Sequence, residues 1–192
     1  MTAERRPRLI VAISGASGVI YGIRLLETLK NQPVETHLIL SKAAEMTLGY
    51  ETDWKVGAVR ALADVNHPVG DIGASLASGS FKTLGMVIAP CSIRSMSEIA
   101  SGVTTTLLTR AADVVLKERR RLVLMLRETP LHSGHLRNML ALSEMGAILA
   151  PPVPGFYARP QSVDDIVDHS VGRVLDLFGL DSGQVKRWRD DA

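Results

Sequence analysis

The chain has 192 residues, of which 46% are hydrophobic, and this predicts one domain with a sizeable buried core. Lys and Arg number 22 against 20 Asp and Glu, and aromatic residues make up 4%, so the sequence lacks the basic face and the stacking platforms of a nucleic-acid-binding protein. The single cysteine, Cys91, excludes an internal disulfide framework and is typical of a cytoplasmic protein.

The first part of the chain predicts strands and helices in alternation. Residues 9–13 form a continuous apolar run, which is typical of a parallel strand covered on both faces. This run is far shorter than the roughly 20 residues of a membrane span, so we expect no membrane association. Apolar residues at helical spacing predict a helix over 19–29. Residues 34–40 predict a second strand, and Ser41 is well placed to cap the helix that follows.

Between residues 52 and 82 the pattern loosens, and we expect a short helix over 56–62 and then a long functional loop over 70–80. The remaining pattern predicts strands over 86–89, 122–126 and 147–149, a mostly helical stretch over 99–116, and helices over 134–145 and 163–178. It also predicts an irregular proline-rich segment over 151–157. Alternating strands and helices predict an α/β fold, a three-layer sandwich whose parallel sheet carries helices on both faces, in Rossmann-like or flavodoxin-like order. We expect one domain with a core over about 8–178 and a polar tail over 181–192.

Two turns at predicted strand ends are candidates for ligand contacts. Residues 14–18 (Ser-Gly-Ala-Ser-Gly) open a helix, where amides and the positive helix end attract phosphate. A tight turn without a ligand is an equally good interpretation. Residues 89–95 offer Ser92 and Ser95, for which plain helix capping is the favoured alternative. Cys91 is interpreted as a small buried residue rather than a nucleophile.

Charged residues elsewhere could bind an anion or move a proton. Arg110, Asp113 and Lys117 share one helical face, which suits a phosphate ester, although internal ion pairs are the alternative. Glu128 follows Arg127 at a strand end and could exchange a proton, or the two could form a salt bridge.

Three further features complete the candidates. Tyr157 follows the prolines and could sit on a rigid lid, and Arg173 is a charge within an apolar helical stretch. His132 and His135 lack a third ligand at suitable spacing, so zinc is not expected.

Several short segments occur together in one order: Ser14-Gly15-Ala16-Ser17-Gly18, Ser41-Lys42-Ala43-Ala44, Glu51-Thr52-Asp53, Ala77-Ser78-Gly79-Ser80, Pro90-Cys91-Ser92, Arg110-Ala111-Ala112-Asp113, Lys117-Glu118-Arg119-Arg120, Arg127-Glu128-Thr129-Pro130 and Pro154-Gly155-Phe156-Tyr157. Each is weak alone. Together they resemble the UbiX-type flavin prenyltransferases over nearly the whole chain, and the resemblance makes residues 1–192 a single flavoprotein domain.

The resemblance implies roles for particular residues. FMN would be held by Gly15, Ala16, Ser17, Ser41, Ser92, Ile93, Arg94, Ser95 and Arg127. Dimethylallyl monophosphate would be bound by Arg110, Lys117, Tyr157 and Arg173, some of them from neighbouring subunits. Glu128, Ser17, Glu51 and Lys117 would be catalytic.

The resemblance also implies a reaction and partners. Reduced FMN would react through N5 and then C6 with the allylic carbon as phosphate departs, without a metal, and the product would serve a UbiD-type decarboxylase. The chain would assemble as a homo-oligomer, often a dodecamer in this family. Two alternatives stay open: an FMN-dependent cysteine decarboxylase of the related fold, and a non-catalytic flavin carrier.

Overall fold

The computed structural model describes residues 6–188, which contain a six-stranded, fully parallel sheet in the order β3-β2-β1-β4-β5-β6. The strands are β1 (Arg8–Ile13), β2 (Glu35–Leu40), β3 (Val65–His67), β4 (Gly85–Cys91), β5 (Arg121–Leu126) and β6 (Ile148–Leu149). Strands β2 and β3 lie in turn on one side of β1, and strands β4, β5 and β6 lie in turn on its other side. This is the Rossmann order, and it places a topological switch point between β1 and β4.

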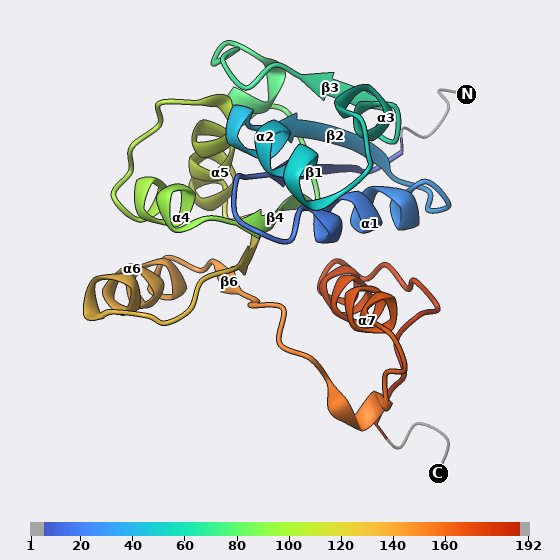
Figure 1. Ribbon diagram of the computed structural model, residues 1–192. Coiled ribbons are helices and arrows are strands. Elements are labelled where there is room, and N and C mark those ends of the chain that lie inside the picture. Colours follow the sequence, from blue (N-terminus) through green and yellow to red (C-terminus); the bar gives the residue numbers. More distant parts are fainter. Residues whose placement is uncertain (1–5, 189–192) are drawn as a thin grey trace.

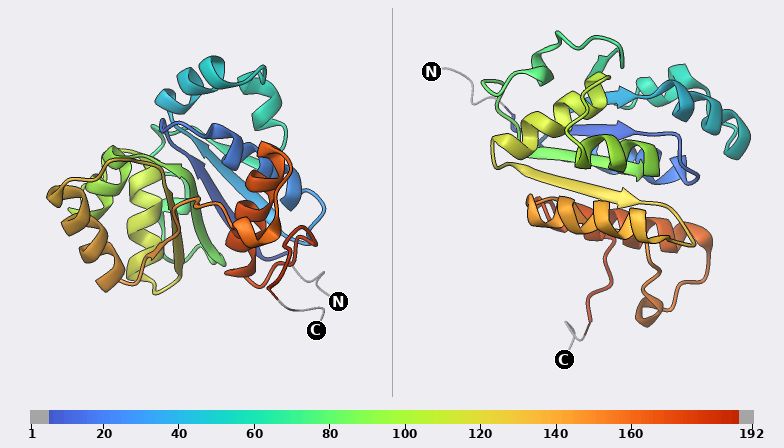
Figure 2. Two further views of the ribbon diagram at one scale, coloured as in Figure 1. Left: turned by 60° about the horizontal axis from the view of Figure 1, so that its bottom comes forward. Right: turned by 90° about the vertical axis from the view of Figure 1, so that its left-hand side faces the viewer.

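Helices lie on both faces of the sheet, as the left view of Figure 2 shows, with α1 and α7 on one side of the strands and α5 and α6 on the other. The helices are α1 (Val19–Leu29), α2 (Lys42–Glu51), α3 (Val56–Arg60), α4 (Ile93–Ala100), α5 (Leu107–Lys117), α6 (Ser133–Glu144) and α7 (Val163–Asp176), with short 3-10 turns η1 (Ser75–Ala77) and η2 (Phe156–Ala158). The predicted three-layer α/β sandwich is confirmed.

The alternating side-chain directions of β1 explain why the buried core has two layers, one on each face of the sheet. Leu9, Val11 and Ile13 belong to one cluster of buried residues together with side chains of α1 and α7. Ile10 and Ala12 belong to a second cluster with side chains of α4, α5 and α6. Because successive residues of a strand point to opposite faces, an unbroken apolar run fills both cores at once.

Residues 99–116, predicted to be mostly helical, contain the end of α4 and most of α5, and the break between the two helices was not predicted. Helix α4 ends in a Schellman motif, in which the amide of Val103 donates to the carbonyl of Glu98 (2.9 Å) and that of Gly102 to Ile99 (3.2 Å). Gly102 takes a φ of 68°, which suits glycine. Thr106 then begins α5 with a capping box to Thr109.

A hydroxyl ties the strands together at the switch point. Ser14 Oγ donates to the carbonyl of Pro90 at 2.8 Å and accepts from the amide of Ser92, also at 2.8 Å. Ser14 is buried. The ends of β1 and β4 are therefore fixed relative to each other where a ligand of this fold class is expected.

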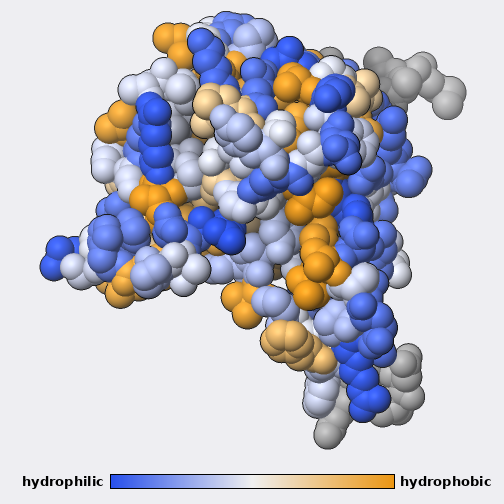
Figure 3. All heavy atoms as spheres, viewed as in Figure 1, coloured by the Kyte–Doolittle hydropathy of each residue, from blue (hydrophilic) through white to orange (hydrophobic). Residues whose placement is uncertain are grey.

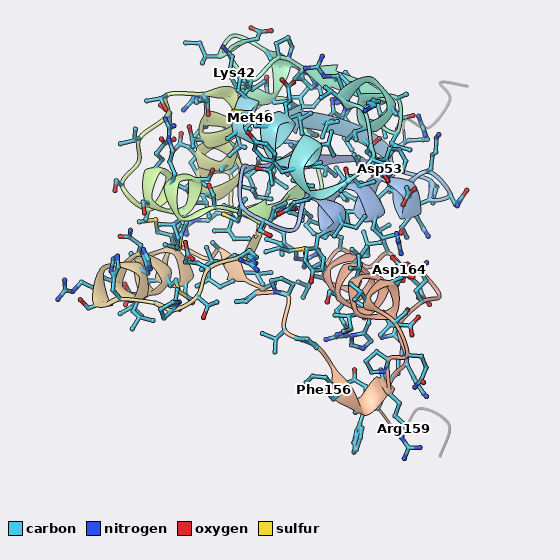
Figure 4. The ribbon with its side chains drawn as sticks, in the orientation of Figure 1. Lys42, Met46, Asp53, Phe156, Arg159 and Asp164 are labelled. Atoms are coloured by element: carbon cyan, nitrogen blue, oxygen red, sulfur yellow. The ribbon has the colours of Figure 1, made fainter. Side chains whose placement is uncertain are left out.

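An arm over residues 150–162 leaves the body of the molecule, and α7 then returns to pack beside α1 (Figure 1). Arg24 on α1 holds α7 through ion pairs with Asp164, at 2.9 Å, and Asp168. Figure 4 shows Phe156 and Arg159 at the far end of the arm, pointing away from the body. In the part of the chain described here, no helix is both long and apolar enough to cross a membrane.

Candidate functional site

A cavity of about 350 Å³ lies at the carboxyl ends of β1, β2 and β4. Its lining includes residues that follow each of these strands and residues at the start of α5: Ser14, Gly15, Ser41, Lys42, Ala43, Val69, Gly70, Ser92, Arg94, Ser95, Glu98, Thr106, Leu108 and Thr109. Hydroxyl groups and apolar walls alternate around it. We call it the strand-end cavity.

Gly15 brings the turn after β1 against α2 so closely that no side chain fits. A Cβ on Gly15 would lie 2.4 Å from the Cβ of Ala43. Gly18 takes a φ of 96° as it leads into α1, and Glu51 Oε2 accepts the amides of Gly18 (2.8 Å) and Val19 (3.2 Å). Glu51 thus occupies amides expected to attract phosphate, and a ligand at this turn would meet Gly15, Ala16 and Ser17 instead.

The serines at the other strand ends both cap helices and face the cavity. Ser41 Oγ accepts the amide of Ala44 at 3.0 Å, and Ser92 Oγ accepts that of Ser95 at 3.2 Å. Ser92 Oγ also donates to Ser95 Oγ at 3.1 Å. The predicted helix capping is therefore correct. The same serines also line the cavity, because a helix that begins at the carboxyl end of a strand places its N-cap at that edge of the sheet.

Arg94 and Ile93 separate in the structure. Arg94 lines the strand-end cavity and pairs with Glu98 at 2.8 Å. Ile93 packs against the second core cluster instead. Glu98 also accepts from Thr105 at 3.4 Å, so its largely buried carboxylate connects α4 to the start of α5.

Arg127 and Glu128 follow β5 outside the lining of the strand-end cavity. The amide of Arg127 donates to the carbonyl of Cys91 at 3.1 Å. Burial raises the pKa of Tyr21, and the positive charge of Arg127 acts in the opposite direction, which places the guanidinium near that phenol. Glu128 is exposed and accepts from the amide of Thr129 at 3.0 Å.

Arg110 and Lys117 lie on α5 beside residues 77–79. Arg110 pairs with Asp113 at 2.6 Å, as the ion-pair alternative predicted, and donates to the carbonyl of Ala77 at 3.3 Å. Lys117 pairs with Glu118 at 2.7 Å. A Cβ on Gly79 would lie 2.2 Å from Glu118 Oε1, so glycine allows this loop to approach the ion pair.

Tyr157 and Arg173 line a second, larger cavity of about 740 Å³ between the arm, α7 and the chain after it. We call it the arm cavity, and it also includes Met125, His169, Val185 and Trp188. Arg173 pairs with Asp176 at 2.8 Å, and Arg187 pairs with the same carboxylate at 3.0 Å. Arg187, followed by Arg173, lowers the pKa of Asp176 below its usual value. Val185, Arg187 and Trp188, which belong to the segment expected to be a polar tail, thus line this cavity, while residues 189–192 of that segment lie outside the described residues.

The structure brings the expected site residues together in groups. Gly15, Ser41, Ser92, Arg94 and Ser95 share the strand-end cavity, with Ala16 and Ser17 in the adjoining turn. Tyr157 and Arg173 share the arm cavity, and Arg110, Lys117 and Glu128 line neither. Within residues 6–188 no group of three or more possible metal ligands occurs.

Sequence reasoning missed several residues of these cavities, above all Glu98, Thr106, Thr109 and His169. Ser14, in contrast, belongs to the turn over 14–18 that the sequence predicted as a ligand contact, and it lines the strand-end cavity. Thr106 and Thr109 could not be found in this way, because the helix break that brings them to the cavity was not predicted.

The fold and the strand-end cavity define an α/β protein of Rossmann strand order with a ligand site at the switch point. The flavoprotein family model matches residues 1–175. Flavin prenyltransferase UbiX of Escherichia coli K12 is 61% identical over 174 residues, which covers 90% of this chain and 92% of the relative.

Solved structures agree with this match. A UbiX protein crystallised with FMN and dimethylallyl pyrophosphate superimposes with a TM-score of 0.95 at 52% identity, over 96% of this chain and 98% of the other. A structure described as a dodecameric FMN-dependent UbiX-like decarboxylase, from Escherichia coli O157:H7, gives 0.93 at 50% identity, over 95% and 99%. The chain belongs to the UbiX-type flavin prenyltransferase family, and the predicted family is confirmed.

Proposed function

We propose that the chain transfers the dimethylallyl group of dimethylallyl monophosphate to N5 and C6 of reduced FMN, and that a UbiD-type decarboxylase uses the prenylated flavin. The match to named flavin prenyltransferases at 61% identity over 90% of the chain carries this proposal. This match agrees with the prenyltransferase activity and the binding of FMN that the sequence predicted.

The strand-end cavity fits a flavin. Gly15 lines it at the point where the turn after β1 approaches α2, and the absence of a side chain there lets the backbone of the turn border the cavity directly. Val69 and Leu108 provide apolar wall, which suits the faces of a ring system, while the hydroxyls of Ser41, Ser92 and Ser95 can bond to its polar edges. Bound reduced FMN supplies the nucleophilic ring atoms, and the chain's own residues supply orientation and charge.

Cationic side chains are suited to stabilise the departing phosphate. Arg110, Lys117 and Arg173 each carry a positive charge, and within residues 6–188 each forms an ion pair with one carboxylate. Preorganised cations near developing negative charge lower the barrier in the way that a divalent ion does in other enzymes. Tyr157 adds a hydroxyl group to the lining of the arm cavity, which also includes Arg173.

The separation of these residues on one chain calls for an assembly. Arg110 and Lys117 lie on α5, whereas Tyr157 and Arg173 line the arm cavity. The arm exposes apolar side chains, with Val153 and Phe156 each 74% exposed, and orange patches interrupt the hydrophilic surface where the arm leaves the body (Figure 3). The chain works as a homo-oligomer, as the dodecameric relative does, and copies of it complete one another's sites.

Proton movements fall to carboxylates and a hydroxyl near the two strand ends. Glu128 is exposed after β5 and can exchange a proton with the leaving phosphate. Ser17 lies in the turn after β1, and Glu51 contacts this turn from the end of α2. The two assist the later loss of a proton from the prenylated flavin. The single cysteine supports a cytoplasmic location for this chemistry.

The cysteine decarboxylase and the flavin carrier, the two alternatives, differ from this proposal in a sequence motif and in the fate of the flavin. A cysteine decarboxylase of this fold carries a Pro-Ala-Ser-Ala-Asn-Thr turn where this chain has Pro90-Cys91-Ser92-Ile93-Arg94-Ser95. A flavin carrier would bind FMN without changing it.

The test is mass spectrometry of the flavin after anaerobic incubation of the protein with reduced FMN and dimethylallyl monophosphate. We expect the flavin to gain the mass of one C5H8 unit, and incubation with oxidised FMN or without the ester to leave it unchanged. Dimethylallyl diphosphate in a parallel incubation tests which ester is preferred. A flavin of unchanged mass in the complete mixture would overturn the proposed transfer.

A further inference from the structure

Tyr157 contacts His169 inside the arm cavity. The phenol oxygen lies 3.0 Å from His169 Nε2, and the two rings pack edge to face with centroids 5.5 Å apart and planes at 79°. Tyr157 belongs to η2 on the arm and His169 to α7, so this contact joins the arm to the helix that packs on the body. Its partners are separated by 12 residues in sequence.

Neighbouring residues hold the phenol in this orientation. Gly155 has no room for a side chain, because its Cβ would lie 2.8 Å from His169 Cε1 and 3.3 Å from Tyr157 Cε1. The ring of Trp188 meets the tyrosine ring edge to face at 5.6 Å. The tyrosine ring is therefore packed between the histidine and the tryptophan, while 42% of the residue stays exposed.

The single proton of the phenol limits what Tyr157 can do. If Tyr157 donates to His169, it has no proton left for an anion. If His169 donates from Nε2–H, the phenol oxygen acts as acceptor and its own proton is free for a phosphate oxygen. Arg173 lines the same cavity, so a phosphate there would meet a cation and this proton together.

We propose that His169 is a positioning residue: its Nε2–H donates to the Tyr157 oxygen and so directs the phenol proton toward the phosphate of the allylic ester. This inference rests on the proposed function, in which Tyr157 binds that ester. It predicts that His169 acts through the tyrosine hydroxyl and not through packing of the arm alone. Donation from His169 also polarises the phenol and strengthens its bond to the anion.

Four variants of the FMN-loaded protein test this: His169→Phe, His169→Gln, Tyr157→Phe and the double variant His169→Phe/Tyr157→Phe. Phenylalanine keeps a ring and removes the donor, whereas the amide of glutamine can replace Nε2–H. Tyr50→Phe is the matched control, since Tyr50 is 82% exposed on α2. Two readouts are measured: the KM and kcat of flavin prenylation, and the Kd of dimethylallyl monophosphate for the oxidised holoprotein by calorimetry, which requires no turnover.

We expect His169→Phe to raise the KM and the Kd about tenfold, as the loss of one well-aligned bond to an anion does. The kcat should change less, and His169→Gln should recover most of the affinity. In the Tyr157→Phe background, His169→Phe should add less than about twofold, because both changes remove the same donor chain. Tyr50→Phe should match the unchanged protein.

An equal loss of affinity from His169→Phe with and without the Tyr157 hydroxyl would overturn the inference and leave His169 a packing role. Unchanged affinity in His169→Phe would overturn it as well. If the unchanged protein binds the ester with this coupling but leaves the flavin mass unaltered, the proposed transfer fails while the role of His169 stands.

Discussion

Glu51 Oε2 lies 2.8 Å from the amide nitrogen of Gly18, so the last residue of α2 caps the first turn of α1. No side chain at the start of α1 itself makes this cap. The carboxylate consequently fixes the turn that carries Ser17 and also lies near the expected position of the flavin. Its capping role and its proposed proton-transfer role can be separated by substitution.

Glu51→Ala removes the cap, and we expect it to lower the free energy of unfolding by about 1 kcal/mol. Glu51→Gln keeps an oxygen that can accept the two amides, so its stability should stay near that of the unchanged protein. It cannot take up a proton, and prenylation should slow by at least about tenfold. Denaturant unfolding and single-turnover mass spectrometry measure both effects. Full-rate prenylation by Glu51→Gln would leave Glu51 with the capping role alone.

Gly15→Ala places a Cβ 2.4 Å from the Cβ of Ala43, so the turn and α2 must separate. We expect a loss of about 1–3 kcal/mol in stability, together with weaker FMN binding in a fluorescence titration. The matched control is Gly49→Ala, within α2 itself, where a Cβ meets nothing within 4 Å. That control should be neutral or stabilising by up to about 1 kcal/mol. Equal stability and equal FMN affinity in both variants would contradict this account of the cavity.

Glu128→Gln should slow transfer by about a hundredfold, as expected for loss of a general acid–base group. FMN affinity should be unchanged, because Glu128 is exposed after β5 and lies outside the strand-end cavity. Single-turnover formation of prenylated flavin and an FMN titration are the two measurements. Loss of FMN from this variant would mean that Glu128 holds the flavin rather than serving the transfer.

Stability should fall as the pH drops from about 7.5 to about 5.5, because the buried His37 lies beside the partly buried His67. His37 Nδ1 lies 2.9 Å from His67 Nε2. Burial lowers the pKa of both histidines below the ordinary 6.5. For His37 the hydrogen bond to Glu35 partly opposes this shift, and for His67 the charge of His37 lowers the pKa further. Below 6.5 the unfolded chain therefore binds protons that the folded chain does not.

Urea unfolding at the two pH values measures this loss. The pKa of Glu35 is lowered mainly by its hydrogen bond to His37, so its own contribution is lost only at still lower pH, below its ordinary 4.5. His67→Gln removes one titrating group and should show a weaker dependence on pH. The same dependence in this variant and in the unchanged protein would assign the effect to other groups.

Cys91 should be inert in the folded protein, because burial raises the pKa of its thiol to about 12. A disulfide reagent such as DTNB near neutral pH should label no thiol in native protein and one thiol per chain in urea. Rapid labelling of native protein would show that the thiol is accessible and would reopen a nucleophilic role.

The sequence predicted the parts of the fold that rest on local pattern. Residues 9–13 could be assigned to a strand because a run filling both cores must be apolar at every position. Strand β3 was missed, since Val65–His67 has only three residues and pairs with β2, a strand distant in the sequence. The Schellman motif at Gly102 left a signal in Ser101-Gly102 that the continuous helical pattern obscured.

For the candidate site too, the sequence predicted what depends on local pattern and missed what depends on distant contacts. Ser41 and Ser92 could be selected because they follow strands, and strand ends meet at one edge of a parallel sheet. The pairing of Tyr157 with His169 could not, because a sequence does not say which face of α7 the proline-rich arm will contact. In the proposed site Arg110 and Lys117 meet Arg173 only between copies of the chain, and local pattern holds no information on such an arrangement.

The outermost strands of the sheet are very short, with three residues in β3 and two in β6. Such margins offer hardly any free backbone groups on which a foreign strand could dock. Association through side chains on helices and on the arm is then favoured over edge-to-edge pairing of sheets, which limits growth into fibrils.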